Sequence, residues 1–104
     1  MNLNDLASQC YNCSYEHGFW ESNNIGEKVA LIHSELSEYL ESIRSGQSFP
    51  DVHCHTFPNE QIELADTIIR ILDLSGALGY DIDGAVKAKM NYNESRPYKH
   101  GKEF

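Results

Sequence analysis

The segment Asn59–Leu78, NEQIELADTIIRILDLSGAL, decides the fold of this chain. Its apolar residues recur at intervals of three and four over more than half of a helical circumference, which is typical of a helix covered on several sides. They are Leu64, Ala65, Ile68, Ile71, Leu72 and Leu78, with Ile62 and Ile69 on another side. Gly79 follows and predicts the end of the helix. We therefore expect a central helix in an all-α domain.

Three further helices are predicted by the same recurrence, over about residues 3–17, 25–43 and 82–93. Asn24 and Glu27 make a start that resembles a capping box, and Asp81 can cap the last helix. Because the third and fourth helices have a short connection, we expect an antiparallel four-helix bundle. The 104 residues should form one domain, with residues 95–104 as a polar C-terminal tail.

Charge is distributed unevenly along the chain. The net charge is −8: residues 1–86 contribute −11 from 14 acidic and 3 basic residues, and residues 87–104 contribute +3 from 2 acidic and 5 basic residues. An acidic protein repels nucleic acid backbones and anionic membranes, so we expect neither polymeric nucleic acid nor a membrane as partner. A cation, or an anion chelated to a metal, is the expected class of ligand.

Cysteine usage and the start of the chain indicate the compartment. The three cysteines are an odd number, which argues against a disulfide framework and for a reducing environment. The start MNLNDLASQC has neither a basic leader nor an apolar run, and no stretch approaches the roughly 20 apolar residues of a membrane helix. We expect a cytoplasmic protein.

Paired carboxylates stand one turn apart in two of the predicted helices. Glu35 and Glu38 are about 60° apart around their helix, on one flank of its apolar stripe. Glu63 and Asp66 repeat this spacing in the central helix, and Asp73 continues the same face. If the two helices pack as neighbours, four or five carboxylates converge in a partly dry cleft, where their repulsion requires a counter-charge.

A hard divalent cation is the counter-charge that this arrangement favours. Ligands that are all oxygen atoms favour Mg²⁺ or Mn²⁺ over zinc, and Mg²⁺ that keeps water ligands can also hold a phosphate. A di-iron site needs Glu-x-x-His pairs, and none of the five histidines has a glutamate three residues before it. The alternative is a solvated acidic surface. Repetition of the pair on two helices, among leucines and isoleucines, favours the metal site.

The two acidic motifs, at positions 35–38 and 63–66, occur together with further segments that are typical of one family. These segments are GEKVALIHSELSEYLE, ELADTIIRILDLSGALGYDI and KMNYNESRPYKHGKEF. Together they resemble the small, single-domain members of the MazG-like, all-α nucleoside triphosphate pyrophosphohydrolases. The resemblance covers about residues 18–104, and the Lys89-x-x-x-Asn93 and Arg-Pro-x-x-His-Gly-Lys elements make it specific.

The resemblance implies a bundle of the all-α NTP pyrophosphatase type and hydrolysis of nucleoside triphosphates to the monophosphate and pyrophosphate, as nucleotide-pool housecleaning. It implies Mg²⁺ ligands at Glu35, Glu38, Glu63 and Asp66, with Mn²⁺ as a possible substitute. Asp73 stands where many relatives have asparagine, so it is expected as an outer or additional ligand. Glu38 is our choice of general base, although spacing does not distinguish a base from a ligand.

The basic end of the chain is expected to bind substrate. Lys89 and Asn93 lie one helical turn apart and Arg96 follows, so they can grip a triphosphate, Arg96 by two parallel hydrogen bonds and Lys89 as a point charge. Trp20, the only tryptophan, lies near His17 in HGFWES. An exposed indole in that position can stack on a base, while a core or interface position is the alternative.

Cys10-x-x-Cys13 and His53-Cys54-His55 contain enough ligands for a zinc site if they converge. Cys10 and Cys13, however, fall on the apolar face of a predicted helix, where thiols usually behave as small hydrophobic groups. The segment GQSFPDVHCHTFPN has two prolines and no helical period, so it predicts a loop. We expect this loop to be a flap near substrate or an interface segment.

The apolar stripe of the second helix is expected to be core; it consists of Ile25, Val29, Ile32, Leu36, Leu40 and Ile43. Because this stripe is narrow and the core of so short a chain is thin, we expect further apolar surface to be buried in a homodimer or homotetramer. The rival interpretation is a non-catalytic helical module that binds a partner through its apolar faces and uses its acidic residues for solubility.

Overall fold

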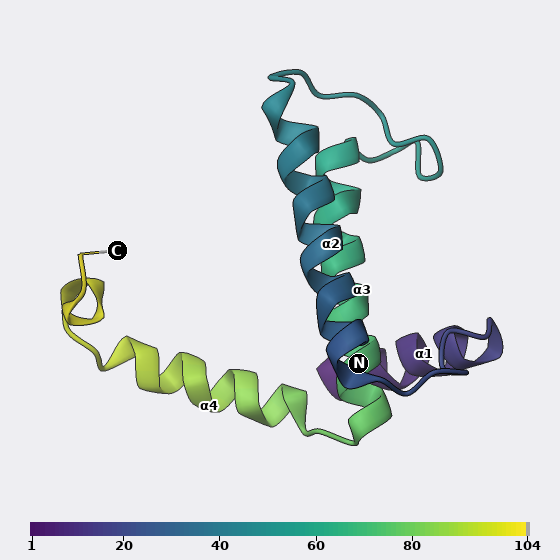
Figure 1. The fold of residues 1–104 in the computed structure, drawn as a ribbon. Helices are drawn as coiled ribbons and strands as arrows, with labels where there is room; N and C mark the ends of the chain where they lie inside the picture. The colour runs from purple at the N-terminus through teal and green to yellow at the C-terminus, as the bar shows by residue number, and fades with distance from the viewer. Residues whose placement is uncertain (104) are drawn as a thin grey trace.

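The computed structural model describes residues 1–103. Their regular secondary structure is helical, and they contain no strand, only one isolated β-bridge between Pro50 and Pro58. The helices are α1 (Leu3–Glu16), α2 (Ile25–Arg44), α3 (Asn59–Leu78), α4 (Ile82–Glu94) and a 3₁₀ helix (Tyr98–Gly101) (Figure 1). The all-α fold and the four predicted helices are confirmed, and each predicted end lies within one residue of the observed end. The polar tail contains the 3₁₀ helix.

Local hydrogen bonds set the ends of these helices. Asn2 and Asp5 form a capping box at the start of α1, in which each side chain accepts the backbone N–H of the other residue. The Asn24 side chain accepts the N–H of Glu27 at 3.1 Å and caps α2. Gly79 ends α3 with a φ of 69°, a left-handed conformation that favours glycine. These short-range signals explain why sequence predicted the boundaries well.

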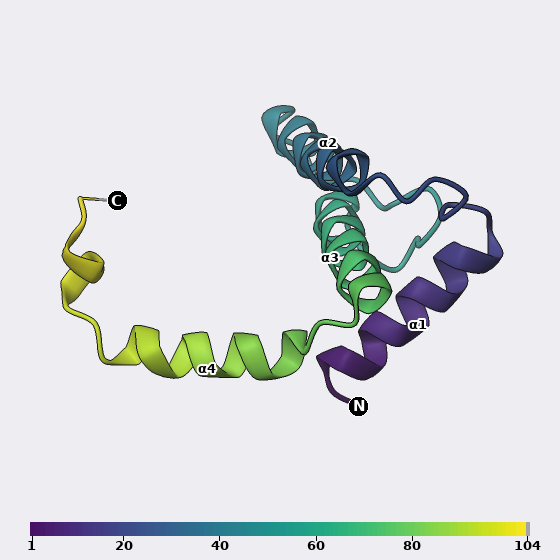
Figure 2. The same ribbon diagram turned by 60° about the horizontal axis from the view of Figure 1, so that its bottom comes forward.

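The central helix is α3, which packs against both α1 and α2. α2 and α3 lie side by side and antiparallel, while α1 crosses the C-terminal half of α3 (Figures 1 and 2). The crossing is close at Gly76, where an added Cβ would lie 2.5 Å from the Ala7 carbonyl oxygen. The fold therefore holds α1 and α2 in a fixed arrangement around α3.

α4 departs from the expected arrangement. Instead of folding back along α3, it begins beside the start of α1 and extends away from the α2–α3 pair (Figures 1 and 2). Three hydrogen bonds fix its start: Asn4 Nδ2 donates to Asp81 Oδ1, the Leu3 N–H donates to Asp83 Oδ1, and the Asp83 N–H donates to Asn4 Oδ1. A single chain therefore does not place four helices in one closed bundle.

The core of the chain is small. Among the described apolar residues, only Ala7 and Leu72 are buried. The prediction that the α2 stripe is core is wrong for one chain, because α2 packs mainly on α3 and five stripe residues remain 39–50% exposed: Ile25, Val29, Leu36, Leu40 and Ile43. No helix in the described residues combines the length and apolar character needed to cross a membrane.

Candidate metal centre and adjoining pocket

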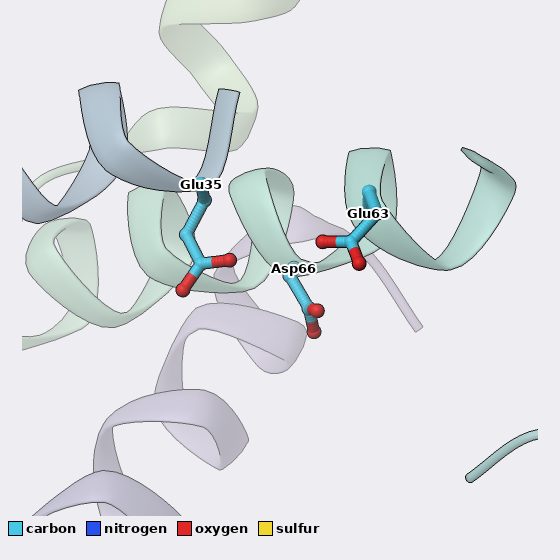
Figure 3. A group of neighbouring side chains, drawn as sticks. All are labelled: Glu35, Glu63 and Asp66. Carbon is cyan, nitrogen blue, oxygen red and sulfur yellow. The ribbon is translucent and has the colours of Figure 1, made fainter. Parts of the chain in front are cut away.

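Packing of α2 on α3 brings three carboxylates together. Glu35 projects from α2 toward Glu63 and Asp66, which lie one turn apart on α3 (Figure 3). One ligand atom of each residue lies within 4.8 Å of those of the other two, and all three residues are half-buried. The expected convergence of acidic side chains from the two helices is therefore present for these three residues, which we call the acidic cluster.

The acidic cluster carries repulsion that its surroundings do not neutralise. Burial, followed by the charge of Glu38, raises the pKa of Glu63, and Asp66 and Glu35 add to this effect. Burial and the charge of Glu35 likewise raise the pKa of Asp66, which the nearby Arg70 partly offsets. Glu63 Oε2 is buried without a hydrogen-bond partner. A buried carboxylate oxygen of this kind is suited to a cation.

Arg70 is the basic residue of this site. Its Nε donates to Glu35 Oε1 at 2.9 Å, and the two side chains are only 31% and 15% exposed. Arg70 follows Asp66 by four residues and so lies on the same face of α3, but the role of Arg70 was not predicted from the sequence. The ion pair fixes the side chain of Glu35 beside the cluster.

The other two predicted ligands lie at the margins. Glu38 is exposed and lies close enough to Glu63 for its charge to raise the pKa of the Glu63 carboxyl. Asp73 is used differently, because its Oδ1 accepts the indole N–H of Trp20 at 2.8 Å. Within residues 1–103, the group with mutually close ligand atoms contains neither Glu38 nor Asp73. Glu38 and Asp73 therefore lie outside the acidic cluster.

Sequence reasoning missed Asp51, a buried carboxylate in the loop between α2 and α3. It accepts the backbone N–H groups of His53 and Cys54, both at 2.9 Å, and the side-chain amide of Asn59 at 3.2 Å. The N–H of Cys54, then that of His53, lowers its pKa. Asn59 also donates to Glu63 Oε1 at 3.4 Å, which links the loop to the acidic cluster. The available signal was the Pro-Asp pair, which is typical of a turn.

A pocket of about 540 Å³ adjoins the cluster between α1 and α3. Glu35 and Asp66 line it, so a molecule in the pocket touches the same carboxylates that form the acidic cluster. His17, predicted to bind substrate, also lines it, together with Phe19 and Ile69. This volume lies within the range of pockets that hold small organic ligands.

Trp20 is packed rather than presented as a flat platform. Its half-buried ring meets Tyr11 edge-on with centroids 5.7 Å apart, and the Lys28 ammonium lies 4.6 Å from its centroid. Lys28 is itself buried and donates to the Phe19 carbonyl. Together with the bond to Asp73, these contacts hold the ring by residues of α1, α2 and α3, and Trp20 is not among the residues that line the pocket.

The predicted phosphate-binding residues do not meet the cluster within one chain. Lys89, Asn93 and Arg96 belong to α4 and its C-terminal flank, which extend away from α2 and α3 (Figure 1). The Lys89 ammonium lies 4.7 Å from the ring of Tyr92, and the Arg96 guanidinium lies 5.4 Å from the same ring. The basic and acidic parts of the predicted site are therefore separate in this chain.

The cysteine and histidine motifs also lie apart. Cys10 and Cys13 line the pocket from α1, whereas His53-Cys54-His55 lies in the exposed loop. These residues form no group with mutually close ligand atoms in the described part of the chain. Burial, with the charge of Asp73, raises the pKa of Cys10, so its neutral thiol is favoured. Nothing in this arrangement supports a zinc site.

Comparison with known proteins leaves the assignment to the residues of the chain itself. No known protein family, curated protein or solved structure matches it. The function is therefore argued from the acidic cluster, the adjoining pocket and the distribution of charge.

Proposed function

We propose that this protein is a Mg²⁺-dependent pyrophosphohydrolase that converts (deoxy)nucleoside triphosphates to the monophosphate and pyrophosphate, as nucleotide-pool housecleaning. The observation that carries the proposal is the convergence of Glu35, Glu63 and Asp66 beside a pocket of about 540 Å³ that Glu35 and Asp66 line. The order and spacing of the acidic motifs, which resemble those of the MazG-like enzymes, support this reaction among the metal-dependent ones.

The acidic cluster fits a hard cation. Its potential ligands are all carboxylate oxygens, Glu63 Oε2 is buried without a partner, and the pKa values of Glu63 and Asp66 are raised by burial and mutual repulsion. Mg²⁺, or Mn²⁺ in its place, would be held by Glu35, Glu63 and Asp66, with Glu38 at the margin. When bound, Mg²⁺ neutralises phosphate charge and makes a coordinated water more acidic.

The protein residues have distinct proposed roles in hydrolysis. Arg70 holds Glu35 in place through its 2.9 Å hydrogen bond. Glu38 is exposed beside Glu63, where it can accept the proton of the attacking water. The pocket lined by His17 and Phe19 accepts the nucleoside, so the triphosphate extends toward the carboxylates. Asp73, fixed by the indole of Trp20, acts as an outer residue of the site.

The chain is proposed to act as a homodimer or homotetramer, in which a second copy completes a helical bundle of the NTP pyrophosphatase type. Its radius of gyration is 16.1 Å, against about 13 Å for a compact domain of this length. Its accessible surface of 7805 Å² exceeds by about 1,900 Å² that of a compact monomer of this size. Obligate dimers bury an area of this order on each subunit.

A panel of ribo- and deoxynucleoside triphosphates with Mg²⁺ tests the activity. Glu63→Gln should abolish turnover, and Glu38→Gln should reduce it at least about a hundredfold because the general base is lost. Glu41→Gln, an exposed acid of α2 that pairs with Arg44, is the matched control and should turn over normally. Turnover that survives Glu63→Gln would contradict the proposal.

The rival function, a non-catalytic interaction module, makes a different prediction. The thermal stability of a pure interaction module should not respond to Mg²⁺ with a non-hydrolysable triphosphate. The proposed enzyme should instead be stabilised by about 3 kcal/mol at a ligand concentration of 100 Kd. The exposed α2 stripe is the observation that favours the module. A stabilisation that Glu63→Gln abolishes and Glu41→Gln retains would exclude it.

A further inference from the structure

The acidic cluster and the basic residues of the C-terminal part carry opposite charges but do not contact each other within one chain. Of the ion pairs among the described residues, one reaches the cluster, between Arg70 and Glu35. Five of the eight lysine and arginine residues lie in residues 87–104, which begin on α4. A triphosphate held at the cluster would bring more negative charge to a region that already carries an excess of it. Additional positive charge must come from elsewhere.

Hydrogen bonds to α1 fix the N-terminal end of α4, and the helix extends away from the acidic cluster of its own chain. Asn4 Nδ2 donates to Asp81 Oδ1 at 2.8 Å, and the Asp83 N–H donates to Asn4 Oδ1 at 3.0 Å. The Leu3 N–H donates to Asp83 Oδ1 at 3.1 Å, so both acids are tied to α1. Swinging α4 back over α3 would break these bonds. Closure within one chain is therefore opposed by the structure.

α4 carries an exposed apolar strip of the kind that packs against another helix. Val86 and Met90 lie one turn apart, are 37% and 60% exposed, and form an apolar strip beside Lys89. On α2, Leu36 and Leu40 are also exposed, within two residues of the acidic pair Glu35 and Glu38. Apolar strips edged by opposite charges are complementary. Together with the excess surface of the isolated chain, they favour a second copy as the occupant.

Resting on the proposed function, we propose that each active site is completed in trans: α4 of one copy packs on the α2 stripe of its partner and brings Lys89 to the partner's acidic cluster. There the Lys89 ammonium group binds phosphate oxygens of the triphosphate as a positive point charge. The dimer is then a requirement of catalysis as well as of stability, because one chain supplies the carboxylates and the other supplies the ammonium group.

Carbodiimide coupling of the metal-free, full-length protein tests this arrangement without activity. The reagent joins a lysine to a carboxylate only when they touch, so a contact in trans gives a covalent dimer on a denaturing gel. We expect mass spectrometry of that band to join the Lys89 peptide to a peptide carrying an acid of the cluster or Glu38. Lys89→Ala should lose this dimer and Lys102→Ala should retain it. A Lys89 link to these acids found only in the monomer band would overturn the proposal.

Complementation between two differently tagged chains, co-expressed and purified by both tags, gives the catalytic test. A Glu63→Gln chain paired with a Lys89→Ala chain should recover about half of wild-type activity, because one of its two sites is intact. The double variant Glu63→Gln/Lys89→Ala paired with a wild-type chain should be inactive. The opposite pattern, with no recovery in the first pair and half activity in the second, would place both residues in one chain.

These tests separate the two proposals. If the wild-type protein hydrolyses no triphosphate, the proposed function fails, while the coupling experiment still decides whether Lys89 reaches the partner's carboxylates. If the wild type is active but the coupled dimer does not depend on Lys89, the proposed function stands and completion in trans is wrong.

Discussion

Arg70 on α3 donates from Nε to Glu35 Oε1 on α2 at 2.9 Å. This contact joins the two helices that carry the acidic motifs and places one positive charge beside the acidic cluster. Arg70 and Glu35 both line the adjoining pocket, so the pair lies between the proposed metal centre and the proposed nucleoside site.

Replacing Arg70 should destabilise the protein, because Arg70 offsets part of the repulsion among the carboxylates of the acidic cluster. Arg70→Gln leaves Glu35 half-buried without its charged partner, so we expect the metal-free protein to lose about 1–3 kcal/mol of stability. Thermal unfolding with and without Mg²⁺ measures this, and Mg²⁺ should restore part of the loss because it supplies positive charge. Arg70→Lys keeps the charge and should lose less. Equal melting temperatures for Arg70→Gln and wild type would contradict the assigned role.

Glu63→Gln should have the opposite effect on the metal-free protein. Because the folded-state pKa of Glu63 is raised, its ionisation destabilises the fold as the pH rises through that pKa, and the variant removes this cost. We expect Tm to increase by several degrees at neutral pH, with a difference that shrinks as the pH falls toward about 4. With saturating Mg²⁺ the wild type should become the more stable protein.

The matched control for that prediction is Glu41→Gln, whose carboxylate is exposed and pairs only with Arg44 in the same helix. Its Tm should change by little in either condition. A Glu63→Gln protein that is less stable than wild type without metal at neutral pH would show that the cluster is not under electrostatic strain.

Trp20 should report on the pocket. Its indole N–H donates to Asp73, which lines the pocket, so a bound nucleotide that displaces Asp73 should change the emission of the single tryptophan. We expect a saturable fluorescence change on titration with Mg²⁺ and a non-hydrolysable triphosphate. Asp73→Ala should remove the wild-type hydrogen bond and shift the emission of the unliganded protein. An emission indifferent to nucleotide, at concentrations that raise Tm, would place the ligand elsewhere.

Leu40→Asp should separate the subunits. Leu40 is 50% exposed in the isolated chain, and a charge on the α2 stripe would be buried without a partner in the proposed dimer. We expect sedimentation to show a monomer with strongly reduced stability. Ser37→Asp, which adds the same charge at an exposed position of the same helix, should remain a dimer. A dimeric Leu40→Asp protein would show that the stripe is not the interface.

Local information determined what the sequence predicted well. The cap at Asn24 and the left-handed Gly79 act within a few residues, and they placed the start of α2 and the end of α3 correctly. The approach of Glu35 to Glu63 and Asp66 was also predicted, because acidic pairs of equal spacing can face each other when their helices pack together.

Long-range contacts determined what the sequence did not reveal. The direction of α4 depends on hydrogen bonds from Asn4 to Asp81 and Asp83, nearly the whole chain away, and no periodicity encodes them. The α2 stripe was assigned to the core because an apolar pattern shows that a face needs cover without showing which chain covers it. Asp51 was missed because its partners are backbone N–H groups, which a residue pattern does not display.

The most direct test of the central claim is phosphorus NMR of each triphosphate incubated with the protein and Mg²⁺. We predict that pyrophosphate and the nucleoside monophosphate appear together in equal amounts, that Glu63→Gln abolishes both signals, and that Glu41→Gln preserves them. Release of inorganic phosphate and a diphosphate, or no turnover of any triphosphate, would contradict it.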